Sequence, residues 1–111
     1  MKRNRISVGE LNHHLGDSIF VEGLVYEIKD HGGILVIDLY DESGYVKAII
    51  GPDSVYSHKT VGEIKKGFHI GVHGKVKTAP HSTFDVENEN GNIEVDVEKM
   101  IIFGKKDKKM I

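Results

Sequence analysis

Three closely spaced runs of strand-forming residues between Ile19 and Ile50 constrain the fold most strongly. The runs cover residues 19–26, 34–40 and 45–50. β-Branched and aromatic residues dominate them, and turn residues fill the intervening segments 30–33 and 41–44. Gly44 can adopt the positive φ that a tight hairpin needs. The pattern predicts a three-stranded meander, which cannot bury its apolar face alone, so later segments must close over it.

Side chains alternate along these runs, which assigns one face of each strand to the core. The residues predicted to face inward on the second and third runs are Leu35, Ile37, Leu39, Val46, Ala48 and Ile50, while Ile19, Val21, Gly23 and Val25 share one face of the first run. A glycine in the middle of a strand weakens the strand unless the chain bends or packs closely there. Gly23 therefore predicts a corner at which the first strand passes from one half of a barrel to the other.

The rest of the chain supplies helical segments and two more strands. Ser7 and Glu10 have the spacing of a capping box, which predicts a short helix or turn that ends at Gly16. Leu11 and Leu15 lie one turn apart on this segment and are expected to pack over one end of a barrel. The later elements are predicted as a helix over 54–66, strands over 68–77 and 93–98 with an apolar extension to 103, and a polar loop over 79–92.

The order β-β-β-helix-β-β indicates an all-β protein, the five-stranded Greek-key barrel of the oligonucleotide/oligosaccharide-binding (OB) fold. One short helix is expected between strands three and four, and another short helix near the N-terminus. Closing the sheet hides the edges that an open meander would expose. At 111 residues the chain is expected to form one domain over 1–111, with an ordered core of about 6–103 and a basic tail over 104–111.

Charge and composition narrow the possible partners. The net charge is −2, but the two ends carry seven of the 15 basic residues and one of the 17 acids, which leaves 8 basic and 16 acidic residues, or −8, in the body. Such a body binds polyanions poorly without local selectivity, since counterion release needs many cations on phosphates. The absence of cysteine and of a long apolar run favours a cytoplasmic protein with no membrane partner and no secretory peptide.

Five segments carry a recognisable pattern, namely 8–11, 21–25, 30–41, 72–76 and 90–95, and its most specific part is the Asp-x-Gly-Gly turn before the aspartate-rich second strand. Together these segments resemble the N-terminal anticodon-binding domain of aspartyl-tRNA synthetases, and asparaginyl and lysyl synthetases share a looser version of the pattern. The resemblance covers about residues 6–103. In that family the outer face of the first three strands binds the tRNA anticodon, so the resemblance implies an RNA partner, most simply a tRNA anticodon loop.

The resemblance also implies site residues. Lys29 stands where the family has an arginine, Val36 where it has a stacking aromatic, and Lys47 where it has a base-reading glutamine; Lys77 keeps a positive charge at the exit of strand four. The expected interface is a lysine stripe on the outer strand faces, with tyrosines as substitute stacking platforms and Phe84 as either a plug of the barrel rim or a stacking face. Its residues are Tyr26, Lys29, Val36, Tyr40, Tyr45, Lys47, Lys75, Lys77 and Phe84.

Other chemistry is weakly supported by the sequence. His69 and His73 are four residues apart on a strand, about 13 Å, which is too far to chelate one metal ion. No nucleophile motif or phosphate loop stands out, so neither a cofactor nor enzymatic activity is expected, whether the chain is a fragment of a synthetase or a free-standing relative. Two alternatives stay open, a single-stranded DNA-binding module and a protein-interaction barrel that has lost nucleic-acid binding.

Overall fold

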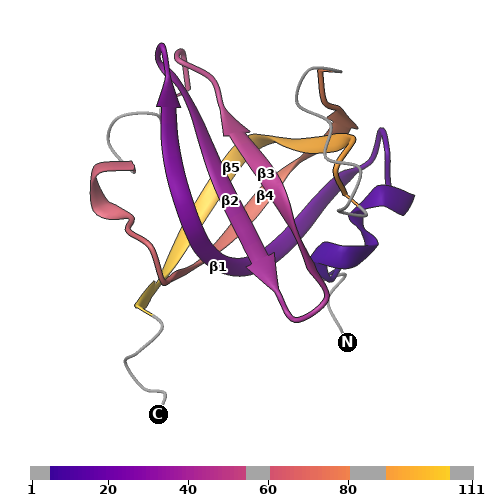
Figure 1. The fold of residues 1–111 in the computed structure, drawn as a ribbon, viewed down its shortest axis with the longest axis horizontal. Helices are drawn as coiled ribbons and strands as arrows, with labels where there is room; N and C mark the ends of the chain where they lie inside the picture. The colour runs from indigo at the N-terminus through magenta and orange to yellow at the C-terminus, as the bar shows by residue number, and fades with distance from the viewer. Residues whose placement is uncertain (1–5, 55–60, 81–89, 106–111) are drawn as a thin grey trace.

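The computed structural model describes residues 6–54, 61–80 and 90–105, which form a closed barrel (Figure 1). Its strands follow the order β1-β2-β3-β5-β4, with β1 also paired to β4, and β3 and β5 run parallel. The elements are η1 (Val8–His13), β1 (Ser18–His31), β2 (Ile34–Asp41), β3 (Gly44–Ile50), η2 (Val61–Glu63), β4 (Phe68–Thr78) and β5 (Ile93–Lys105). The predicted five-stranded barrel is therefore confirmed.

Strand β1 belongs to both halves of the barrel and changes partner next to Gly23. It pairs with β4 from Ser18 to Leu24 and with β2 from Leu24 onward, so Leu24 lies opposite residues of both partners. A Cβ atom at Gly23 would lie 2.7 Å from the carbonyl oxygen of Tyr40. Only glycine allows this close approach, which agrees with the corner expected at this position.

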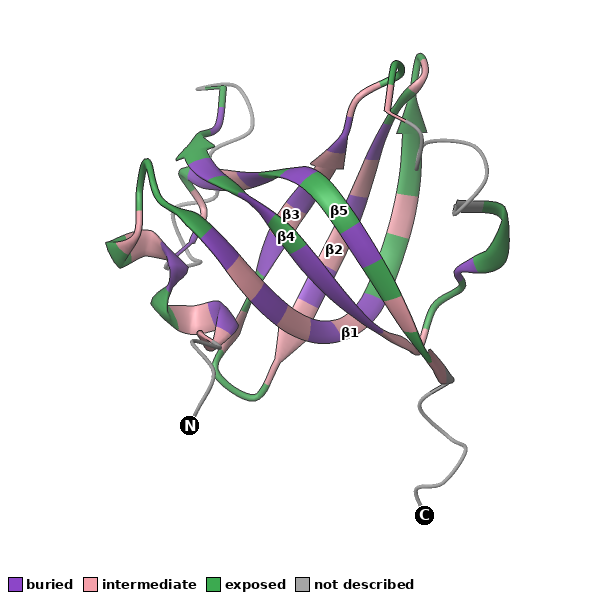
Figure 2. Ribbon diagram, turned by 180° about the vertical axis from the view of Figure 1, so that it is seen from behind, coloured by how far each residue is buried: buried purple, intermediate pink, exposed green. Residues whose placement is uncertain are grey.

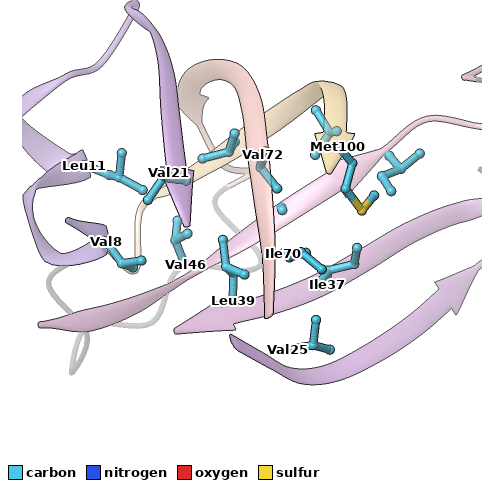
Figure 3. Packing of buried hydrophobic residues seen from close by; sticks show 14 of the residues in the cluster. Val8, Leu11, Val21, Val25, Ile37, Leu39, Val46, Ile70, Val72 and Met100 are labelled. Atoms are coloured by element: carbon cyan, nitrogen blue, oxygen red, sulfur yellow. The ribbon is translucent and has the colours of Figure 1, made fainter. Parts of the chain in front are cut away.

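The predicted inward-facing residues all lie in the core. Each of them is buried, and the residues between them are intermediate or exposed, as the stripes along the strands in Figure 2 show. β4 and β5 complete the core with side chains that meet those of β1–β3 in the barrel interior (Figure 3). The largest fully buried side chains are Leu11, Ile37, Leu39, Ile50 and Ile70, followed by seven valines.

The helical segments of the described residues are short 3-10 helices. The N-terminal segment is a 3-10 helix that buries Val8 and Leu11 and leaves Leu15 55% exposed, because the chain has left the helix by Gly16, whose φ is +90°. Between β3 and β4 the described residues form only the three-residue η2, and the chain then turns at Gly67 into β4. Residues 55–60 of the predicted helix lie outside the described residues.

Polar contacts fasten η1 over one end of the barrel. The backbone N–H of Val8 donates to Oδ2 of Asp41 at 3.0 Å, and that of Gly9 donates to Oγ of Ser43 at 2.7 Å. The amide of Asn90, a residue only 2% exposed, donates to the carbonyl oxygens of Val8 (2.7 Å) and Tyr45 (3.2 Å). The β2–β3 hairpin therefore has a fixed position relative to η1, and a Cβ at Gly9 would meet the Ser43 carbonyl oxygen.

Asp41→Ala is expected to destabilise the domain by about 1–2 kcal/mol near neutral pH. Hydrogen bonds to a charged group contribute about 1.5–3 kcal/mol, and the partial exposure of this site reduces that contribution. Burial acts to raise the pKa of Asp41, but hydrogen bonds from Ser43, Val8 and Gly44 outweigh it and hold the pKa below the ordinary 3.8. Since the folded-state pKa lies below the unfolded one, this stabilisation is present above pH 3.8 and is lost as the pH falls through the folded value.

Urea unfolding of the wild type and of Asp41→Ala at pH 7 and pH 3 would check this expectation. Asp53→Ala, which removes an exposed carboxylate from the loop after β3, is the matched control. A difference in unfolding free energy that is the same at both pH values would contradict the assigned role of the carboxylate.

Candidate nucleic-acid interface

A groove of about 820 Å³ lies over the outer face of β1, β2 and β3, beside the β2–β3 hairpin. Both polar and aromatic side chains form its walls, and each comes from an outward position of a strand or from the hairpin turn. The lining residues are Tyr26, Lys29, Asp38, Tyr40, Asp41, Glu42, Ser43, Gly44, Tyr45 and Lys47.

Three tyrosines give the groove its aromatic surface. Tyr26 is 54% exposed, and its ring meets that of Tyr40 edge-on, with centroids 6.2 Å apart and an interplanar angle of 87°. Tyr45 lies opposite Tyr40 in the β2–β3 pairing and is 37% exposed. Exposed ring faces of this kind are surfaces on which unpaired bases stack.

A β-bulge in β1 places Tyr26 and Lys29 on the same face. The register with β2 shifts between Val25 and Glu27, so Tyr26 is an extra residue with no partner on β2. Val25 is fully buried, Tyr26 and Glu27 are both exposed, and Ile28 packs against the core, which leaves Lys29 outward. In a regular strand Glu27 and Lys29 would follow Val25 into the barrel interior.

The charges in the groove are mixed rather than uniformly basic. Lys29 has its Nζ 4.0 Å from Oε1 of Glu27, and Lys47 lies opposite Asp38 in the β2–β3 register. Partial burial raises the pKa of Asp38; the positive charges of Lys47 and Lys29 oppose the rise, and the Glu27 carboxylate adds to it. The two lysines thus flank a carboxylate that is costly to keep ionised.

The remaining lysines of the predicted stripe lie farther round the barrel. Lys77 on β4 has its Nζ 3.6 Å from Asp96 and 3.8 Å from Glu94 of β5. Across the sheet the register aligns Asp38, Lys47, Glu94 and Lys77, so the charges alternate from strand to strand. Lys75 is exposed opposite Asp96, one row away.

The structure therefore brings together five of the predicted site residues and separates others. The five that line one groove are Tyr26, Lys29, Tyr40, Tyr45 and Lys47. Val36 is on the outer face in the next row, opposite Lys29 and Ile49. Lys75 and Lys77 lie on β4, beyond β5, and Phe84 lies outside the described residues.

The interface expected from the sequence contains no acid, so Asp38 is a groove residue that was missed. The signal was available in the alternation, since Asp38 is two residues from Tyr40 on the same outward face. The sequence contains no comparable sign that Glu42 and Ser43 of the hairpin turn line the groove, because their position depends on the contact between η1 and the turn.

Neither a metal centre nor a membrane span emerges from the described parts of the chain. Within residues 6–54, 61–80 and 90–105, no three His, Asp or Glu side chains are placed to hold one metal ion. His69 instead lies 3.1 Å from Oε1 of Glu22. No helix in these ranges is long and apolar enough to cross a bilayer.

Comparison with known proteins places this barrel among nucleic-acid-binding domains. Residues 19–103 match the model of the tRNA anti-codon family, described as an OB-fold nucleic acid binding domain. The chain is 35% identical over 96 residues to the aspartate–tRNA(Asp/Asn) ligase of Dictyoglomus turgidum, and 32% identical over 91 residues to that of Bradyrhizobium diazoefficiens. The matches cover 85% and 82% of this chain but only 16% and 15% of those ligases.

Solved structures show the same barrel at lower identity. Aspartyl-tRNA synthetase from Entamoeba histolytica matches with a TM-score of 0.76 at 13% identity, over 91% of this chain and 21% of its own. Asparaginyl-tRNA synthetase from Pyrococcus horikoshii gives 0.68 at 19% identity, over 88% and 24%. An OBody bound to hen egg-white lysozyme gives 0.73 at 15% identity, over 95% of this chain and 98% of its own. These three similarities concern the fold.

Proposed function

Because the chain belongs to the tRNA anti-codon family of OB-fold nucleic acid binding domains, we propose that it binds single-stranded RNA in the groove over β1–β3, and that its target is a tRNA anticodon loop. Its relatives at 32–35% identity are ligases that act on tRNA(Asp/Asn), which favours an anticodon loop over other single strands. The domain contributes binding rather than catalysis, whether it is joined to a catalytic domain or stands alone.

One observation carries the proposal, namely that two lysines and three tyrosines meet in one groove on the outer face of the first three strands. Lysine ammonium groups neutralise backbone phosphates, and tyrosine rings stack with bases that are not held in a duplex. The Asp38 carboxyl disfavours a phosphate beside it, so a base edge rather than the backbone is expected to lie against it. A duplex, whose bases are already stacked, lacks the free ring faces that this arrangement binds.

Titration of fluorescently labelled RNA at two salt concentrations tests the proposal. We expect a tRNA(Asp) anticodon stem-loop to bind with a dissociation constant of about 10 μM or tighter in 50 mM salt and more weakly in 200 mM salt, since phosphate contacts release counterions. A fully paired hairpin stem of the same length should bind less. Absence of salt-sensitive binding to the stem-loop would contradict the proposal, and equal affinity for the same loop made of DNA would point to a single-stranded DNA module.

Tyr26→Ala is expected to weaken binding of the stem-loop about 10-fold, because base–aromatic stacking contributes about 1–3 kcal/mol per base. Tyr26→Phe keeps the ring and should bind like the wild type. Both variants should melt near the wild-type temperature, because Tyr26 is 54% exposed and has no partner on β2. If the alanine and phenylalanine variants bind equally well, the ring is not a stacking platform.

A further inference from the structure

Tyr26 separates the groove from a second hollow on the same side of the barrel. This hollow has a volume of about 580 Å³ and is lined by Tyr26, Glu27, Ile28, Lys65 and Lys66. Tyr26 lines both spaces, so the surface continues from Lys29 past the tyrosine ring to the segment between η2 and β4. The strand pattern alone does not place Lys65 and Lys66 near the predicted interface.

The ammonium group of Lys66 lies over the ring of Tyr26, with Nζ 5.0 Å from the ring centroid. This cation–π contact holds a positive charge at the end of the aromatic surface. Both Lys65 and Lys66 are exposed, so their charges face solvent. The arrangement of a flat ring followed by cations suits a nucleotide strand, in which a stacked base is followed by phosphates.

The backbone under the two lysines is anchored to the barrel. Ile64 is 3% exposed and packs in the core just before them. The N–H of Gly67 donates to the carbonyl oxygen of Val25 at 2.7 Å, and that of Phe68 donates to the carbonyl oxygen of Lys65 at 3.0 Å. The lysines therefore extend from a fixed turn next to the bulge in β1, which limits the entropy lost when they bind a ligand.

We propose that the RNA strand runs past Tyr26 into this second hollow, where Lys65 and Lys66 bind phosphates of the nucleotides next to the base stacked on Tyr26. This inference rests on the function proposed above and adds the path and length of the bound strand. Two lysines face one acid, Glu27, in the hollow, so its charge favours a polyanion. The bound strand is then longer than the groove over β1–β3 alone would accommodate.

A series of single-stranded oligouridylates and oligocytidylates of three to nine nucleotides tests the proposal by fluorescence competition. For the wild type, affinity should rise with length until the strand fills both hollows. For Lys65→Gln/Lys66→Gln, we expect the rise to stop at a shorter length and the longest oligomers to bind about 25-fold more weakly at 0.1 M salt. The slope of log K against log salt should decrease by about 1.4, corresponding to two phosphates on a single strand.

The matched control is Lys75→Gln/Lys99→Gln, which removes two charges from exposed positions on β4 and β5. If the Lys65/Lys66 variant retains the wild-type length dependence and salt slope while Tyr26→Ala loses affinity, the extended path is wrong and the groove function stands. If wild type binds neither the oligomers nor the stem-loop, both proposals fail. An equal loss in the control variant would also overturn the path, since the effect would then follow net charge.

Discussion

Glutamine at both Lys29 and Lys47 is expected to weaken binding of the anticodon stem-loop about 25-fold at 0.1 M salt. Each phosphate contact on a single strand contributes about 0.7 to the slope of log K against log salt, so two lost contacts remove about 1.4. Relative to 1 M salt, where these contacts contribute nothing, a slope of about 1.4 corresponds to a factor of about 25 at 0.1 M salt. The two lysines come from β1 and β3 and line the same groove, on either side of Asp38. Once both are gone, the Asp38 carboxylate faces the RNA with no cation beside it in that groove.

The experiment that checks this is a salt titration of stem-loop binding with Lys29→Gln/Lys47→Gln, beside the equally charged control Lys75→Gln/Lys99→Gln. The control also decides whether Lys75, which the sequence places in the lysine stripe, belongs to the interface. We expect little loss from it, because Lys75 lies on β4 opposite Asp96 and outside the groove. A control that loses as much affinity as the groove variant would contradict the assignment of the site to β1–β3.

Gly74→Ala is expected to destabilise the domain by about 3 kcal/mol, the upper part of the range for overpacking, because the neighbouring atoms include backbone. A Cβ at this position would lie 2.4 Å from the carbonyl oxygen of Asp96 and 2.8 Å from Cγ1 of Val95. Gly74 is buried where the β4–β5 register shifts, so neither strand can move away without breaking its pairing. The melting temperature should fall by roughly 12–24 °C for a domain of this size.

Thermal unfolding of Gly74→Ala and of Gly51→Ala would check the expectation. A Cβ at Gly51 would meet no atom within 4 Å, so this control should melt near the wild-type temperature. A small decrease in the melting temperature of Gly74→Ala would mean that β4 and β5 can separate slightly at low energetic cost. The β4–β5 pairing would then adapt to added volume more easily than its close packing indicates.

The core could be predicted from the sequence because it depends on the alternation of side chains alone. Ile37, Leu39 and Val46, for example, are buried where the pattern places them. The corner at Gly23 was also predictable, since a glycine in an apolar strand has few other physical roles. The helices were less predictable, because Gly62 and Gly67 favour a short turn over a continued helix and because tertiary packing decides between them.

The site was predictable only in part. Alternation places Tyr40 and Lys47 outward, but it gives no indication of which outward residues share a groove once the sheet curves into a barrel. Lys75 and Lys77 lie away from the groove because β5 stands between β3 and β4 in the strand order. The joint placement of Tyr26 and Lys29 depends on the bulge in β1. The sign of this bulge in the sequence is that two consecutive outward residues, Tyr26 and Glu27, separate the inward residues Val25 and Ile28.

The bulge has a consequence for how such domains diversify. Because β2 has no residue opposite Tyr26, its omission would restore an ordinary pleat and leave Ile28 inward and Lys29 outward, as they are now. At this bulge position a side chain that contacts the ligand can be gained, exchanged or lost during evolution with little effect on the stability of the adjacent strands. Related domains that differ in ligand preference are therefore expected to share their core residues and to differ by the presence or absence of one residue at the bulge.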